Sequence, residues 1–184
     1  MIKYVCAAAA VLALGACETT SSRPYTPSTS NILAFQAALK ESDAKVQVAS
    51  FSMTPGVSEN MTCRALGALE VAPGKTAREF IEGAMRDELF ASGMYDAATG
   101  KVIRGEVTEL DFNSMGTGSW DIGLKLSSDE LPEGYTIATH YTFKTSYSAI
   151  KACQNVIDAF TPAVQELIGK AVADPQFKTL AGAN

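Results

Sequence analysis

The chain has 184 residues, with 15 Lys and Arg against 20 Asp and Glu, and its formal net charge is −5. That length suits one domain with its own hydrophobic core. The basic residues are dispersed, without a basic cluster or stripe, which argues against nucleic acid as a partner and against purely electrostatic adhesion to anionic lipid.

The first 17 residues have the order of a secretory signal peptide. Lys3 gives a positive start, an apolar run of about 13 residues follows, and then come Cys17 and a polar stretch. A membrane-spanning helix needs about 20 apolar residues, so this run is too short, and no other segment comes close. We therefore expect an exported protein without a transmembrane helix.

The sequence Leu14-Gly15-Ala16-Cys17 resembles the bacterial lipobox, in which a Leu and two small residues precede an obligatory Cys. The resemblance implies that the leader, residues 1–16, is removed and that Cys17 carries acyl chains. Glu18 after the Cys implies, by the habit of such lipoproteins, an outer-membrane anchor facing the periplasm. Two alternative interpretations stay open. The segment could be a cleaved signal peptide in which the Cys is incidental, or it could be a helix of the folded core.

Residues 17–30 are expected to form the lipidated start and a flexible tether, because they are rich in Ser, Thr and Pro and lack apolar periodicity. Residues 31–184 are expected to form a single periplasmic domain. A short helix with Asn31 as its cap opens this domain.

The next elements are a strand over 45–53 and a second strand or extended run over 63–71. From Thr76 the apolar spacing changes to a helical period. Thr76 is the expected N-cap and Glu79 its capping-box partner, and Gly93 marks the stop.

Three further strands are expected over 101–112, 119–127 and 135–145. In the first strand the apolar residues switch from odd to even positions midway, which predicts a β-bulge near Thr108–Glu109. Strict alternation in the other two indicates an antiparallel sheet with one buried and one wet face.

A long helix closes the domain, and we expect a kink or break just before Pro162. Its apolar stripe is predicted to comprise Ile150, Cys153, Val156, Ile157, Phe160, Val164, Leu167, Ile168 and Ala171. The segment after it is expected to be a stop and tail. The fold class is therefore α+β: a two-layer sandwich with a mostly antiparallel sheet of four or five strands packed on two helices, in the order β-(β)-α-β-β-β-α.

Two of the four cysteines, Cys63 and Cys153, remain once Cys6 leaves with the leader and Cys17 carries lipid. An even remainder in an exported chain favours a disulfide. Two buried thiols or a metal site are the alternatives. Zinc is disfavoured because the chain has one His and no Cys-x-x-Cys, so we expect no metal and no cofactor.

No catalytic constellation stands out in the sequence. His140 shares parity with the wet face of its strand, and no nucleophile-elbow motif is present. We expect a protein that is not an enzyme.

Blocks over most of the mature chain look like a group of uncharacterised proteobacterial lipoproteins, and Cys63 and Cys153 fall in matching blocks. These blocks include "CRALGALEVAPGKTAREFIEGAMRDELFASGMYD", "SWDIGLKLSS", "HYTFKTS" and "ACQNVIDAFTPAVQELIGKAVADPQFK". The resemblance strengthens the expectation of a disulfide but implies no activity. The element order is also similar to that of small envelope lipoproteins that accompany transport systems, including the auxiliary lipoproteins of lipid-transport ABC machines.

Three functions remain open from the sequence. The favoured one is a non-enzymatic binding or accessory component of the cell envelope, with an envelope protein or lipid as partner. Its expected partner surfaces are the wet sheet face around His140 and Thr142, or the loops at 54–62 and 127–134. The others are a lipid or small-ligand carrier with a cavity between helices and sheet, and an envelope hydrolase.

Overall fold

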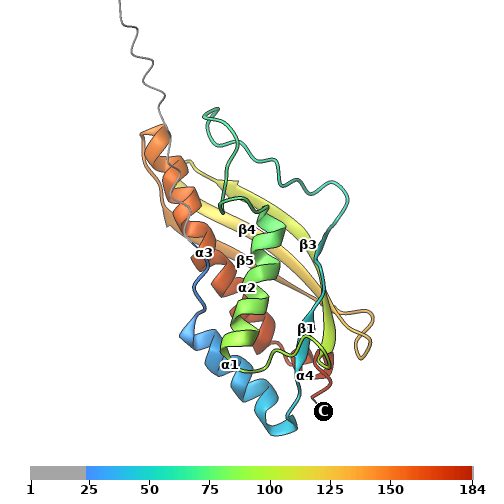
Figure 1. Ribbon diagram of the computed structural model, residues 1–184. Helices are drawn as coiled ribbons and strands as arrows, with labels where there is room; N and C mark the ends of the chain where they lie inside the picture. The colour runs from blue at the N-terminus through green and yellow to red at the C-terminus, as the bar shows by residue number, and fades with distance from the viewer. Residues whose placement is uncertain (1–23, 184) are drawn as a thin grey trace, which may run out of the picture.

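The computed structural model describes residues 24–183 (Figure 1). The expected signal peptide and the expected lipidation site at Cys17 lie outside the described residues, as do residues 18–23 of the expected tether.

A five-stranded sheet forms one layer of the domain. Its strands are β1 (Val46–Val48), β2 (Ser52–Met53), β3 (Lys101–Asn113), β4 (Thr117–Ser127) and β5 (Tyr135–Lys144). The strand order is β1-β3-β4-β5, and β2 also pairs with β3. β1 and β2 run parallel to β3, whereas β3, β4 and β5 are antiparallel neighbours.

The helices lie together on one side of this sheet (Figure 1). They are α1 (Thr29–Leu39), α2 (Ala77–Ala91), α3 (Ala149–Ala173) and the short α4 (Gln176–Leu180), with a 3₁₀ turn, η1, at Lys40–Ser42. Parallel neighbouring strands need a crossover connection, and α2 supplies it between β2 and β3. The predicted two-layer α+β class, with a mostly antiparallel sheet, is confirmed.

An aromatic row connects the two layers. Trp120 of β4 packs on Phe160 of α3, with ring centroids 4.7 Å apart, and Phe160 packs in turn on Phe80 of α2 at 5.3 Å. The Trp120 indole N–H donates to the carbonyl of Val156, at 2.8 Å. Because this buried N–H is satisfied, the side chain can fill the core without leaving a polar group unpaired.

Local signals in the sequence account for α2. Thr76 is its N-cap, its hydroxyl accepts from the Glu79 N–H, and the Glu79 carboxylate accepts from the Thr76 N–H. This is the predicted capping box. Gly93, just beyond the helix, has φ +76, a conformation that glycine adopts without steric cost.

The bulge in β3 is also confirmed. The pairing with β4 shifts register between Val107 and Glu109, which turns Leu110 to the buried face shared by Ile103. Opposite the bulge lies Gly123, where an added Cβ would come within 2.5 Å of the Thr108 hydroxyl oxygen.

Several local predictions were wrong. Residues 63–71 do not form a strand, because Arg64 and Ala65 have positive φ. The cap of α1 is Ser28, while Asn31 is buried. Ile150, expected on the buried stripe, is 63% exposed.

Predictions at the two ends of the domain were also wrong. The expected C-terminal tail contains α4. α3 itself is continuous through Pro162, so the predicted break is not present. Residues 24–30, which the sequence assigned to the tether, are placed against the domain, and α1 already begins at Thr29.

Candidate functional site

The wet sheet face carries a small polar cluster centred on Asp121. One carboxylate oxygen lies 2.5 Å from His140 Nδ1, and the other accepts from the Ser119 hydroxyl at 3.1 Å. As predicted, His140 is exposed. A hydrolytic triad needs the imidazole between the hydroxyl and the carboxylate, whereas here the carboxylate lies between them. The cluster is thus not arranged to activate Ser119.

A second candidate lies at one end of the molecule, where the disulfide is. Cys63 and Cys153 are bonded, with Cα atoms 5.8 Å apart, so the predicted disulfide is present. It joins the loop that precedes α2 to the second turn of α3. Because α3 is packed on the sheet, the disulfide fixes this loop to the body of the domain.

Arg64, next to the disulfide, connects three loops. Its Nε donates to the Ser114 hydroxyl at 3.1 Å and its Nη2 to the Ser114 carbonyl, in the β3–β4 turn. Its Nη1 donates to the Ser146 carbonyl at 3.0 Å, in the β5–α3 loop. The planar guanidinium can serve several acceptors at fixed angles, which a lysine cannot. We call this end, formed by residues 63–67, 114–116 and 145–151, the tip.

The tip has an open pocket of about 540 Å³. It is lined by Arg64, Met115, Gly116, Thr145, Ser146 and Tyr147. Tyr147 is fully exposed, and no carboxylate within residues 24–183 forms an ion pair with Arg64. The tip therefore combines an apolar surface with an unneutralised positive charge.

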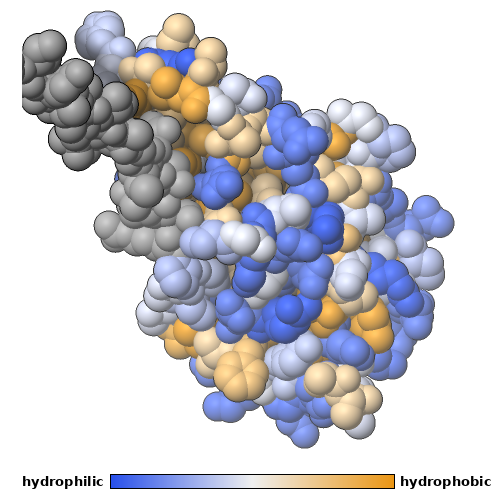
Figure 2. Space-filling model, turned by 45° about the horizontal axis from the view of Figure 1, so that its top comes forward, coloured by the Kyte–Doolittle hydropathy of each residue, from blue (hydrophilic) through white to orange (hydrophobic). Residues whose placement is uncertain are grey.

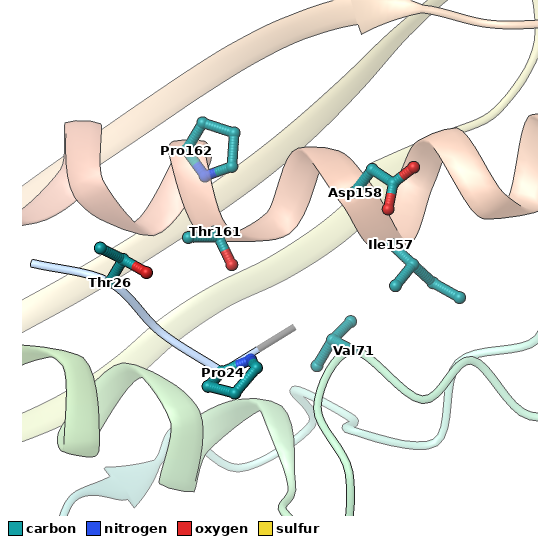
Figure 3. Close-up of a pocket in the computed structure, with 7 residues that line it drawn as sticks. All are labelled: Pro24, Thr26, Val71, Ile157, Asp158, Thr161 and Pro162. Carbon is teal, nitrogen blue, oxygen red and sulfur yellow. The ribbon is translucent and has the colours of Figure 1, made fainter. Parts of the chain in front are cut away.

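A third candidate is a pocket of about 370 Å³ between α3 and the first described residues (Figure 3). Pro24 and Thr26 face Thr161 across it, and Ile157 points toward Val71. Because Pro162 has no N–H, it gives the Asp158 carbonyl no helical hydrogen bond. The lining of the pocket thus combines apolar side chains with the polar residues Thr26, Thr161 and Asp158.

A further pocket of about 320 Å³ lies on the other side of Pro24, between α2 and the loop at 72–75. A shallower pocket lies beside Gly169. None of these four pockets is lined by a residue of a strand. The four described pockets thus lie outside the expected cavity between helices and sheet.

The segment between these pockets is held by Glu88, which is buried at 0% exposure. One of its oxygens accepts from the Tyr25 hydroxyl at 2.6 Å, the Ser28 N–H at 2.8 Å and the Asn31 amide at 3.1 Å. Burial, and then the hydrogen bond to Glu88, raise the pKa of the Tyr25 phenol, which therefore stays protonated and donating.

Sequence reasoning did not single out Arg64, Tyr25 or Glu88. Arg64 directly follows a cysteine, but nothing in the sequence tells that its side chain spans two distant loops. The only weak signal for Tyr25 was an aromatic residue inside a Ser-, Thr- and Pro-rich stretch.

No group of three or more His, Cys, Asp or Glu side chains in residues 24–183 is placed to hold a metal ion. Over the same residues, no helix has the length and hydropathy of a membrane span.

Comparison with known proteins leaves the family open. No family model matches the chain, and no curated protein matches it. A crystal structure of a Xanthomonas campestris protein assigned to the family DUF330 is similar, with 16% identity and a TM-score of 0.47, over 70% of this chain and 84% of that one. A likeness this distant assigns neither family nor function.

Proposed function

We propose that this protein is a lipoprotein of a bacterial cell envelope, anchored in the outer membrane through acyl chains on Cys17 and facing the periplasm. The lipobox-like sequence before Cys17 supports the anchor. The single structural observation that carries the proposal is the Cys63–Cys153 disulfide, because such bonds persist in oxidising compartments and are rare in the cytosol.

Its role in the envelope, we propose, is non-enzymatic binding as an accessory component. The tip supports this role: it is built by a disulfide and an arginine that connects three loops, yet what it presents to solvent is apolar and cationic. Clustered apolar side chains on a surface mark interaction sites.

The anchor is tested by intact mass and fractionation of the full-length chain expressed in a bacterium. We expect the mature mass to include acyl chains and the protein to sediment with outer membranes. Cys17→Ala should abolish both, whereas the matched control Cys6→Ala, in the leader, should leave both unchanged. An unmodified mass for the wild type would reject the proposal.

The binding role is tested by placing a photo-crosslinking residue at Tyr147 in the tip or at His140 on the wet face. Crosslinks to one reproducible envelope molecule from either position support it. Absence of any reproducible product from both positions would contradict it.

A second candidate function is a carrier of a lipid or small ligand. The two pockets on either side of Pro24 favour it, since their volumes of about 370 and 320 Å³ lie in the range of small-molecule sites. Native mass spectrometry of the Cys17→Ala chain, prepared without detergent, tests this function. A stoichiometric co-purified small molecule supports a carrier, and a ligand-free mass counts against it.

A further inference from the structure

The exposed apolar side chains of the protein are concentrated at the tip. Six large apolar side chains in residues 24–183 are exposed, and four of them belong to the tip: Leu66, Met115, Tyr147 and Ile150. We call these four the tip patch. Single exposed apolar residues are common, but a group on one end of a domain marks a contact surface. In Figure 2, which brings this end forward, hydrophobic residues gather there beside hydrophilic ones.

The tip patch is held in place by its surroundings. Its four residues come from three separate segments, which the Cys63–Cys153 bond and the Arg64 guanidinium connect. Arg64 and Ala65 have φ values of +46° and +59°, and such backbone strain persists where neighbouring contacts impose it. The exposure of the patch is therefore built into a fixed arrangement of loops.

The pairing of charges distinguishes the tip from the opposite end. Arg64, Lys144 and Lys151 lie at or next to the tip, and no described carboxylate forms an ion pair with any of them. Two acidic residues lie on the nearby loop: Glu59 is paired with Arg78, and Glu70 is exposed beside residues 63–67 of the tip. At the other end of the sheet, the β4–β5 loop carries three carboxylates, of which Glu130 is paired with Lys101 and Asp129 with Arg104. The tip thus suits an anionic surface, although the whole chain is acidic.

The length of chain before the described residues limits where a membrane can lie. Cys17 precedes Pro24 by seven residues, which span at most about 25 Å. Pro24 shares a pocket with Thr161, and α3 rises about 17 Å from Thr161 back to Ile150. A lipid on Cys17 can therefore reach a bilayer that touches the tip.

The direction of residues 24–31 along α3 also places Cys17 on the side of the tip. Thr26 accepts a hydrogen bond from Gln165, and Asn31 donates to the Gln165 carbonyl and lies against Gly169. Followed backward from Asn31 to Pro24, the described chain thus runs along α3 toward the tip, away from the end with the β4–β5 loop.

We propose that the tip patch rests on the phospholipid surface of the membrane that holds Cys17. Its four apolar side chains lie among the headgroups, and Arg64, Lys144 and Lys151 face the lipid phosphates. This inference rests on the proposed function, because the short connection matters only if Cys17 is lipidated. It adds an orientation to that function: the sheet and helices stand on the membrane by one end, with the β4–β5 loop directed away from it.

The test places a fluorescent probe at the tip of the full, acylated chain. Tyr147→Trp puts an indole in the tip patch, and the matched control Phe90→Trp puts one at a position on α2 that is 74% exposed and outside the tip. The native Trp120 is fully buried and common to both variants. The proteins are reconstituted in vesicles of phosphatidylethanolamine and phosphatidylglycerol whose acyl chains carry bromine, a short-range quencher.

We expect a clear loss of emission from Tyr147→Trp relative to wild type and none from Phe90→Trp. Adding Lys144→Glu and Lys151→Glu to Tyr147→Trp should reduce that loss. Equal quenching at both positions, or none at Tyr147→Trp, overturns the proposal. A Tyr147→Trp emission that is unquenched in these vesicles but shielded in native membranes would assign the tip to a protein partner or a second copy instead.

The intact mass of the same samples separates the two claims. An acylated chain without quenching at the tip overturns the membrane contact and leaves the anchor standing. A chain without acyl mass overturns the proposed function, and the membrane contact falls with it.

Discussion

The Tyr25 hydroxyl donates to the Glu88 carboxylate at 2.6 Å, which connects the first described residues to the middle of the helical layer. The same oxygen of Glu88 also accepts from Ser28 and Asn31, while its other oxygen has no partner among the described residues. These three hydrogen bonds to one buried oxygen hold residues 25–31 against α2. The composition of the sequence alone assigned most of this segment to a tether.

Removing this acceptor should loosen the start of the domain. Glu88→Ala leaves the Tyr25 hydroxyl and the Ser28 N–H without their partner, whereas the Asn31 amide keeps the Gln165 carbonyl, and buried unsatisfied groups cost about 1–3 kcal/mol each. We expect a loss of about 2–4 kcal/mol in the free energy of unfolding, measured by urea titration. Glu88→Gln keeps an acceptor oxygen and should lose much less. Equal losses for the two variants would contradict this account.

Arg64 should determine how rigid the tip is, with a smaller effect on the whole fold. Arg64→Lys removes the fork that serves Ser114 and Ser146, and hydrogen bonds from a charged donor contribute about 1.5–3 kcal/mol. We expect amide exchange to accelerate in 113–117 and 145–148, with little change in β4. Arg86→Lys is the matched control, because Arg86 lies on α2, outside the tip, and is paired with Glu82. This variant should leave the exchange of those loops unchanged. Unchanged exchange at both loops in Arg64→Lys would show that the disulfide alone holds the tip.

Where short-range chemistry decides the structure, the sequence was sufficient. The capping box of Thr76 and Glu79 and the change of parity at Thr108 are local patterns, and both predicted the structure correctly. The fold class followed from them, together with the alternation in β4 and β5.

Where distant partners decide, the sequence failed. Composition around Tyr25 indicates a tether, but a buried carboxylate 63 residues away overrides it. Residues 63–71 have strand-like composition, yet the disulfide and the Arg64 contacts impose a tight loop. The tip as a site could not be predicted for the same reason, since it exists only after three separated segments meet.

The positive φ of Ala65 predicts that glycine is better there. A non-glycine residue in the left-handed region costs about 1–2 kcal/mol, and glycine avoids this cost at an entropic penalty of about 0.5–1 kcal/mol. Ala65→Gly should therefore stabilise the fold by about 0.5 kcal/mol. The reverse change nearby, Gly67→Ala at φ +111°, meets no atom within 4 Å and should destabilise through the backbone alone. Thermal unfolding of both variants measures this, and a destabilised Ala65→Gly would contradict it.

Glu166 should give the protein part of its acid sensitivity. Its carboxylate is bonded to Lys170 at 2.8 Å and to the Thr139 hydroxyl, and these contacts lower its pKa below the ordinary 4.5. A lowered folded-state pKa contributes stability above the unfolded value, which is lost as pH falls through the folded value. Wild type should therefore exceed Glu166→Gln in urea resistance at about pH 6, and the gap should shrink toward about pH 3. A gap that does not change with pH would show that the contact acts without the charge.

The disulfide should stabilise the whole fold and the tip to different extents. Cys63 and Cys153 are 90 residues apart, and closing a loop of this length contributes about 4–5 kcal/mol in the chain-entropy model, although the observed effect is often smaller. We expect Cys63→Ala with Cys153→Ala to lower the free energy of unfolding by about 2–5 kcal/mol and to make it insensitive to reductant. Because the aromatic row of Trp120, Phe160 and Phe80 does not involve the bond, the variant should keep its sheet and helices in circular dichroism. Its amide exchange should rise most in 63–67, where Arg64 still bonds to Ser114 and Ser146 but the covalent link to α3 is lost. A variant that exchanges like wild type in this loop would show that the bond acts only on the unfolded chain.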